Sequence, residues 1–332
     1  MPEKAKFYHA LQAHVAQCDL CHHFCKIRDG RYGFCRTRVN RGGKLFTLNY
    51  GHPAAIGTDP VEKKPLYHFL PGSLTFSLGT YGCNFRCDNC QNWEISQKSG
   101  HDRQPPFRTA VSVVQAALAR GCPSISFTYN EPTIFAEYAL DIMKPARSAG
   151  LKNIWVSNGY MSDYCLDTVA PLLDAVNIDL KSMDDAFYRR TCSALQRPVL
   201  QNLKRLARSD IHLEITTLLL PGLSDSPEML RRLADFIAVE LGPETPWHLS
   251  SFVPWISWKS HDIPATTAEG TETAHAIGKK AGLAYVYDQH HHTSTLCPKC
   301  GTTIVERHRY TTIRHDKAGS CPGCGYPIVT QR

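Results

Sequence analysis

The strongest constraint on this chain is an alternation of short β-branched or aromatic runs with longer helical stretches between about residues 73 and 288. Such an alternation is typical of βα units that surround a parallel sheet. The helical stretches carry start and stop signals: Thr109 begins one that ends at Gly121, and Ser226 begins another. Seven runs are predicted strands: residues 74–78, 124–129, 153–157, 175–180, 212–219, 247–252 and 283–287.

A series of βα units closes, or partly closes, into a barrel. Seven strands are fewer than the eight of a closed barrel, so the sequence predicts an α/β fold with an open, partial barrel whose side can admit a large substrate. Residues 73–292 form this barrel in our prediction. Residues 1–72, rich in glycine and cysteine, are a metal-binding lead-in, and residues 293–332 are a small separate module.

Composition narrows the functional class. No segment reaches the roughly 18 consecutive apolar residues of a membrane span, and the first 17 residues lack the uninterrupted apolar stretch of a signal peptide. We therefore expect a cytoplasmic protein without membrane contact. The formal charge of +7 gives no strong case for nucleic acid. Fourteen cysteines in a reducing compartment indicate metal ligands before they indicate disulfides.

One cysteine group has three members, Cys83, Cys87 and Cys90, and follows the first predicted strand after a turn at residues 79–82. Three thiolates can hold three irons of a cubane and leave the fourth iron for a substrate or cofactor. The bare C-x3-C-x2-C pattern also occurs in zinc sites. Its position at the carboxyl end of a strand, where barrel enzymes place catalytic groups, favours a reactive cluster.

The last cysteines form two C-x2-C pairs, twenty residues apart, that are typical of a zinc ribbon. Four thiolates complete a tetrahedral zinc site, so this zinc is predicted to be structural; unligated cysteines are the alternative. The predicted ligands are Cys297, Cys300, Cys321 and Cys324.

The N-terminal cysteines have the spacing C-x2-C-x3-C-x9-C, which fits two kinds of metal site. Four sulfurs can close a zinc site, the interpretation we favour from the sequence, and three of them can bind a second iron–sulfur cluster. The residues are Cys18, Cys21, Cys25 and Cys35.

Through these motifs the sequence resembles the radical S-adenosylmethionine (SAM) superfamily, whose signature is the three-cysteine loop after the first strand of a partial (β/α)6 barrel. The resemblance covers roughly residues 70–290. The chain is similar to relatives of glycyl-radical-enzyme activases, such as pyruvate formate-lyase activating enzyme. It is more similar still to the radical SAM member of the AmmeMemoRadiSam system. Residues 59–68, residues 91–93 and the N-terminal cysteine series match that subgroup.

The resemblance implies a [4Fe-4S] cluster on the three-cysteine loop and SAM as its partner. A family motif after the second strand contacts the methionyl amino group of SAM, and the matching residues here are 128–132. Asn130 and Glu131 are therefore predicted to bind the cofactor, Glu131 through a charge-assisted hydrogen bond. Alternatively, Glu131 complements the dipole of the following helix.

Four further residues are assigned to the cofactor by resemblance. Asn158 follows the third predicted strand, while Asp179 and Lys181 follow the fourth. A turn with an ion pair is their alternative reading. His248 corresponds to a histidine near the cofactor in activases, or it is a hydrogen-bonded core histidine. The superfamily commonly has an aromatic residue where this chain has Asn89, so Phe85 or Tyr129 must supply the packing around adenine.

The resemblance implies reductive cleavage of SAM to a 5'-deoxyadenosyl radical, which then abstracts a hydrogen atom from an unknown, activase-like substrate such as a protein or peptide. A reductant such as flavodoxin or ferredoxin is the implied partner. Memo-like and AMMECR-like proteins are further candidate partners. The rival hypothesis is a zinc-scaffolded module that binds protein or nucleic acid through a catalytically silent barrel.

Overall fold

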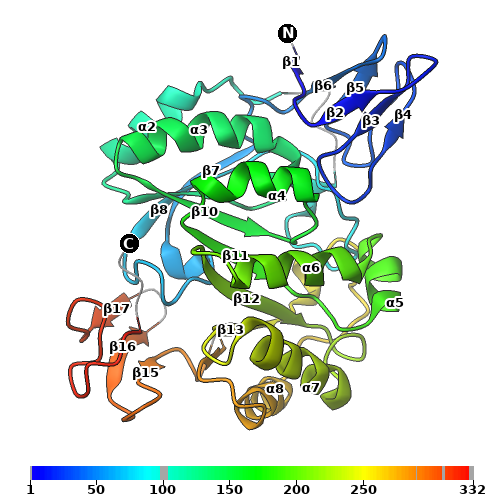
Figure 1. The fold of residues 1–332 in the computed structure, drawn as a ribbon. Helices are drawn as coiled ribbons and strands as arrows, with labels where there is room; N and C mark the ends of the chain where they lie inside the picture. Colours follow the sequence, from blue (N-terminus) through cyan, green and yellow to red (C-terminus); the bar gives the residue numbers. More distant parts are fainter. Residues whose placement is uncertain (1, 98–103, 289, 309–310, 329–332) are drawn as a thin grey trace.

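The computed structural model describes residues 2–97, 104–288, 290–308 and 311–328, and its centre is an eight-stranded sheet (Figure 1). Seven of the strands are parallel and follow each other in chain order, and one edge strand is antiparallel. The strands of this sheet are β7 (Ala55–Pro60), β8 (Leu74–Gly79), β9 (Ser124–Phe127), β10 (Lys152–Ser157), β11 (Ala175–Asp179), β12 (His212–Leu219), β13 (Trp247–Ser251) and β14 (Val286–Tyr287).

The predicted open barrel is confirmed. Strands β14 and β7 are the two edges of the sheet and do not pair with each other within the described residues. All seven predicted strands are present, with ends that differ by a few residues. The sheet also continues into the lead-in, because β7 pairs antiparallel with β8 from Ala55 opposite Gly79 to Pro60 opposite Leu74. Pro60 is tolerated there because it ends an edge strand.

Helices cover the outer face of the sheet (Figure 1), and several begin at side-chain caps that the sequence supplies. Thr109, Ser162, Ser226 and Thr267 each accept a hydrogen bond from a backbone N–H of the first turn of their helix. The α-helices are α1 (Trp93–Ser96), α2 (Ala110–Ala119), α3 (Ala136–Ser148), α4 (Asp163–Val169), α5 (Asp185–Phe187), α6 (Gln196–Ala207), α7 (Pro227–Phe236) and α8 (Ala268–Lys280). Short 3-10 or π turns are η1 (Val61–Lys63), η2 (Pro132–Phe135), η3 (Ala170–Leu172), η4 (Tyr188–Cys192), η5 (Ile237–Leu241) and η6 (Pro254–Ile256).

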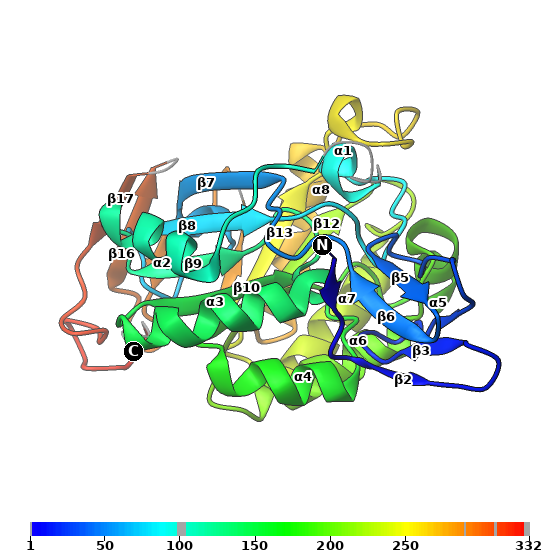
Figure 2. The ribbon, with the colours of Figure 1, turned by 90° about the horizontal axis from the view of Figure 1, so that it is seen from above.

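Two smaller parts flank the barrel on opposite sides, the N-terminal strands in blue and the C-terminal module in red (Figures 1 and 2). The N-terminal part has two three-stranded sheets, and the C-terminal part has one. Their strands are β1 (Glu3–Lys4), β2 (Tyr8–Ala10), β3 (Ala16–Cys18), β4 (Lys26–Ile27), β5 (Arg38–Arg41), β6 (Lys44–Thr47), β15 (Thr295–Leu296), β16 (Thr303–His308) and β17 (Thr311–Arg314). No helix among the described residues is both long and apolar enough to cross a membrane.

A buried ion pair joins the N-terminal strands to the barrel. Arg38 of β5 donates through Nη1 and Nη2 to the two carboxylate oxygens of Glu137 in α3, both at 2.6 Å. Both side chains are 1% exposed. Because a guanidinium without its carboxylate would be an uncompensated buried charge, this pair fixes how the lead-in sits on the barrel.

We expect Glu137→Ala to lower the free energy of unfolding by about 3 kcal/mol or more, because it leaves the Arg38 guanidinium buried without a counter-charge. Urea titration followed by circular dichroism measures this loss. The matched control is Arg205→Ala, which removes exposed ion pairs with Asp163 and Asp167 and should cost about 1 kcal/mol or less. Equal losses in the two variants would contradict the structural role of the buried pair.

Candidate active site

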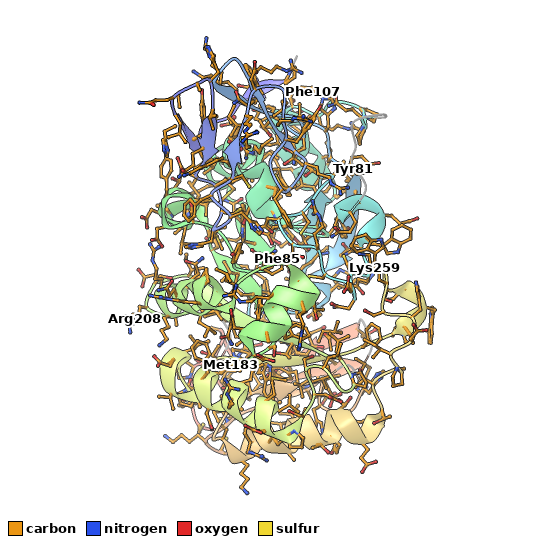
Figure 3. All side chains as sticks on the ribbon, turned by 90° about the vertical axis from the view of Figure 1, so that its right-hand side faces the viewer. Tyr81, Phe85, Phe107, Met183, Arg208 and Lys259 are labelled. Atoms are coloured by element: carbon orange, nitrogen blue, oxygen red, sulfur yellow. The ribbon has the colours of Figure 1, made fainter. Side chains whose placement is uncertain are left out.

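The three-cysteine loop starts directly where β8 ends and lies largely out of solvent. Cys83 and Cys87 are buried, and Cys90 is half-buried. The backbone N–H of Phe85 donates to Cys83 Sγ at 3.3 Å, and Cys90 Sγ lies 3.1 Å from Ser96 Oγ. In Figure 3, Phe85 lies near the middle of the molecule, with Tyr81 nearer the N-terminal strands.

The residue before the first cysteine, Gly82, must be a glycine because the lead-in approaches its backbone closely. Its φ is +92°, and an added Cβ would lie 2.5 Å from Thr37 Cγ2 and 2.7 Å from the carbonyl oxygen of Cys35. Both the backbone conformation and the contact exclude a larger residue. The lead-in therefore packs directly against the turn that presents the cysteines.

The thiols of this loop fit a metal cluster chemically. Burial raises the pKa of the Cys83 and Cys90 thiols, so without a cation they remain protonated. Metal binding requires thiolates, and the cation compensates the cost of burying their charge. Three sulfurs on one short loop, beside a cavity, suit a cubane with one open iron.

A cavity of about 740 Å³ opens beside the three cysteines. It receives side chains from the carboxyl ends of the barrel strands, the end at which barrel enzymes bind substrates. Phe85 and Tyr129, the predicted neighbours of adenine, both line it. So do five of the six predicted cofactor contacts: Asn130, Glu131, Asn158, Asp179 and Lys181.

Glu131 is the most connected of these residues. Its Oε1 accepts hydrogen bonds from the Thr133 N–H at 3.0 Å and from Ser157 Oγ at 2.8 Å, and its Oε2 accepts one from the Asn158 N–H at 2.8 Å. Burial raises its pKa, while these donors oppose the increase. Glu131 therefore caps η2, as the alternative reading expected, and also lines the cavity.

Two asparagines tie the cluster loop to the neighbouring strand ends. Asn158 Nδ2 donates to Asn84 Oδ1 at 2.7 Å. Asn130 Nδ2 donates to the carbonyl of Gly82 at 2.7 Å, and Asn130 Oδ1 accepts from the Thr80 N–H at 3.1 Å. Asn130, predicted as a cofactor contact, thus fixes the turn that precedes the cysteines.

Asp179 and Lys181 form an ion pair at the cavity wall, with Lys181 Nζ 2.9 Å from Asp179 Oδ2. Asp179 is the last residue of β11, and the Lys181 backbone N–H is held by Tyr188 Oη at 3.1 Å. Two interpretations were made from the sequence, a contact with the cofactor and a turn with an ion pair. Both are compatible with this geometry, because the pair bridges neighbouring loop positions and also faces the cavity.

The structure does not bring His248 to the cavity. Its Nε2 lies 2.6 Å from Glu214 Oε2, and its ring stacks on Tyr287 with centroids 5.3 Å apart. Glu214 also accepts from the backbone N–H groups of Tyr67 and His68. His248 therefore belongs to a buried network at the amino ends of the strands, which matches its alternative reading as a core histidine.

The sequence reasoning missed a second polar group in the cavity. Asp59 Oδ2 accepts hydrogen bonds from Lys64 Nζ at 2.8 Å and Tyr129 Oη at 2.7 Å, and Lys64 Nζ lies 4.7 Å from the centroid of the Tyr129 ring. All three residues line the cavity. The signal was present in the stretch 59–68, which matched the activase-like subgroup but had no assigned role.

The C-terminal cysteines form a compact metal-binding group. Cys297 Sγ lies 3.6 Å from Cys324 Sγ, and Cys300 Sγ lies 3.5 Å from Cys321 Sγ. All four sulfurs lie within 4.8 Å of one another, which suits tetrahedral ligation and is compatible with the predicted zinc ribbon.

The N-terminal cysteines do not gather as closely as the C-terminal four within the described residues. Among the described residues, no three of these four sulfurs lie within 4.8 Å of one another. A tetrahedral zinc with bonds of about 2.3 Å needs sulfurs about 3.8 Å apart, and zinc binding by the N-terminal cysteines stays a prediction. The residues are Cys18, Cys21, Cys25 and Cys35.

The comparisons with known proteins agree with this fold. Residues 77–237 match the Radical SAM superfamily. The chain is 38% identical over 332 residues to "Uncharacterized protein MJ0808" of Methanocaldococcus jannaschii, and the match covers 98% of each sequence. It is 24% identical over 196 residues to the pyruvate formate-lyase 1-activating enzyme of Escherichia coli K12, covering 56% of this chain and 79% of that enzyme.

A solved structure of a radical SAM methyltransferase from Sphaerobacter thermophilus shares the fold, with a TM-score of 0.50, 15% identity and 71% of each chain covered. The protein thus belongs to the radical SAM superfamily and is related to the activases of glycyl radical enzymes. Membership implies a [4Fe-4S] cluster and SAM as cofactors.

We expect Gly82→Ala to lower the iron bound after anaerobic reconstitution to roughly half or less, because the added methyl group clashes with the lead-in and displaces the cluster loop. Iron analysis per chain measures the effect. Gly121→Ala is the matched control, since Gly121 also has a positive φ, +62°, but has open space around its Cβ position. An unchanged iron content in Gly82→Ala would show that the loop tolerates the displacement.

Proposed function

We propose that this enzyme uses a [4Fe-4S] cluster on Cys83, Cys87 and Cys90 to generate a 5'-deoxyadenosyl radical from SAM and to abstract a hydrogen atom from a protein or peptide. One observation carries the proposal: the three cysteines and the polar groups from three successive strand ends line a single cavity of about 740 Å³. The cofactors supply the radical when bound. The chain binds, orients and shields them.

The Glu131 carboxylate is suited to hold the amino group of SAM. It is 2% exposed, lines the cavity and, within the described residues, accepts one hydrogen bond at Oε2. A carboxylate–ammonium contact in such a buried place is a charge-assisted hydrogen bond. In this proposal, Asn158 and the Asp179–Lys181 pair bind the polar parts of SAM, and Phe85 or Tyr129 packs against adenine.

The residues at the rim of the cavity favour a protein or peptide as the substrate. The segment after β13 reaches across to the cluster loop, where the Lys259 N–H donates to the carbonyl of Asp88 at 2.8 Å (Figure 3). This segment contains Ile256, which lines the cavity, and Trp255, which is 76% exposed. Exposed aromatic residues are common anchors of protein interfaces. The similarity to pyruvate formate-lyase activating enzymes points the same way.

The remaining assignments complete the proposal. A structural zinc occupies the four C-terminal cysteines, where the sulfur spacing suits it. A cytoplasmic electron-transfer protein such as flavodoxin or ferredoxin supplies the electron. Memo-like and AMMECR-like proteins remain predicted partners on the sequence resemblance alone.

Anaerobic reconstitution with iron and sulfide, followed by dithionite and SAM, should give 5'-deoxyadenosine and methionine, measured by chromatography. Cys87→Ala should lower this yield by roughly a hundredfold or more, because the cluster loses one of its three ligands. Cys122→Ala is the matched control: Cys122 is equally buried but does not line the cavity. A reconstituted cluster that gives no deoxyadenosine would favour the zinc-scaffolded binding module.

We further expect Glu131→Gln to raise the KM for SAM by roughly tenfold or more, because it removes the charge from a buried hydrogen-bond acceptor. Deoxyadenosine formation at varied SAM concentration measures the change. Glu240→Gln, which alters a partly exposed pair with Lys204, should leave the KM unchanged. Equal KM values for wild type and Glu131→Gln would assign Glu131 a purely structural role.

A further inference from the structure

The four N-terminal cysteines form a second thiol-rich site outside the cavity. Cys18 ends β3, Cys21 and Cys25 follow in the next loop, and Cys35 precedes β5. Cys18, Cys21 and Cys35 are each less than 10% exposed, and Cys25 is half-buried. None of the four is in a disulfide. Buried free thiols in this number suit a metal centre better than four separate core positions.

Two contacts organise this site around Cys25. Its carbonyl accepts a hydrogen bond from the Cys18 N–H at 2.9 Å, and its Sγ accepts one from the Phe34 N–H at 3.5 Å. The two loops that carry the sulfurs are therefore held together. Backbone N–H groups directed at cysteine sulfur are also one of the means by which proteins set cluster potentials.

The sulfur spacing distinguishes the three cysteine groups. The C-terminal four lie within 4.8 Å of one another, as a single tetrahedral ion requires. Among the residues that the structure describes, neither the N-terminal set nor the loop of Cys83, Cys87 and Cys90 contains three sulfurs within 4.8 Å of one another. The ligands of a cubane bind separate irons and so stand farther apart than the ligands of one ion. In this respect the N-terminal set resembles the cluster loop.

The N-terminal site packs against the cluster loop itself. His23 Nε2 lies 2.6 Å from the carbonyl oxygen of Asn84. Gly82 packs against the carbonyl oxygen of Cys35. The Arg86 guanidinium stacks over the Phe34 ring, with 4.5 Å from Cζ to the centroid, and donates to the Phe34 carbonyl. A single layer of side chains thus links the two cysteine sets.

Arg86 places a positive charge in this layer. Its guanidinium donates to the carbonyls of Cys83, Phe85 and Phe34. A partly buried cation needs a nearby negative charge, and clusters with cysteine thiolate ligands on both sides provide one.

We propose that Cys18, Cys21, Cys25 and Cys35 hold a second [4Fe-4S] cluster that passes electrons to the cluster of the active site, a role that rests on the proposed function. Four sulfurs ligate all its irons, so it binds no substrate and serves electron transfer. A one-electron donor protein such as reduced flavodoxin is oxidised by one electron. The second cluster gains that electron and passes it on, and the active-site cluster is reduced by one electron, with no bond or proton exchanged.

The metal content of three anaerobically reconstituted proteins tests the site. Wild type should hold about eight irons per chain, and the triple variant Cys83→Ala, Cys87→Ala, Cys90→Ala should keep about four. The irons of the triple variant should give a reduced-cluster signal in electron paramagnetic resonance that SAM does not alter. The quadruple variant, with all four N-terminal cysteines changed to serine, should keep about four irons whose signal SAM does alter.

A triple variant without iron, together with two zincs in wild type, would overturn the second cluster. If the quadruple variant fails to fold, wild type and the triple variant still decide the question. These metal counts need no SAM cleavage, so they hold even if the proposed function is wrong.

The electron path has its own measurement. With reduced flavodoxin as the donor, the quadruple variant should form deoxyadenosine roughly tenfold more slowly than wild type, or slower still. With dithionite, which reaches the active-site cluster directly, the two rates should match. Equal rates with flavodoxin would overturn the relay, and an equal slowing with both donors would show general damage to the site instead.

Discussion

The Glu131 carboxylate is the interaction on which the geometry of the barrel mouth depends. It accepts hydrogen bonds from Thr133, Ser157 and Asn158, and so joins the ends of two neighbouring strands. Asn158 extends the network to Asn84, inside the cluster loop. Each of these buried groups would cost about 1–3 kcal/mol if left without a partner. These hydrogen bonds hold the loop in one position, which is the preorganisation that catalysis requires.

The lead-in forms the second support of the same loop. One buried apolar cluster includes Phe7 and Leu20 of the lead-in together with the barrel core, so the two parts share a core. The Arg38–Glu137 pair fixes their relative position, and Gly82 allows the backbone of the lead-in to touch the turn before the cysteines. The N-terminal segment thus packs directly against the loop that carries Cys83, Cys87 and Cys90.

Much of this architecture could be predicted from the sequence, because βα periodicity and strand-end motifs are local signals. The antiparallel β7 was missed because Gly57 and Pro60 disguise an edge strand. The prediction placed His248 on the correct strand but at the wrong end of it. It is the second residue of β13, near the amino end, whereas Ser250 and Ser251 reach the cavity. Hydrogen-bond partners such as those of Asn130 depend on tertiary packing and have no sequence signal.

The metal at each cysteine group illustrates the same limit. Sequence spacing shows that four thiols can meet, and both the N-terminal and the C-terminal groups satisfy that condition. The choice between one ion and a cubane depends on how far apart the backbone holds the sulfurs. In the C-terminal group the turn between β15 and β16 and the segment after β17 bring the sulfurs together. In the N-terminal group the sulfurs belong to loops packed against the barrel, so the centre that we propose there depends on this packing more than on the number of cysteines.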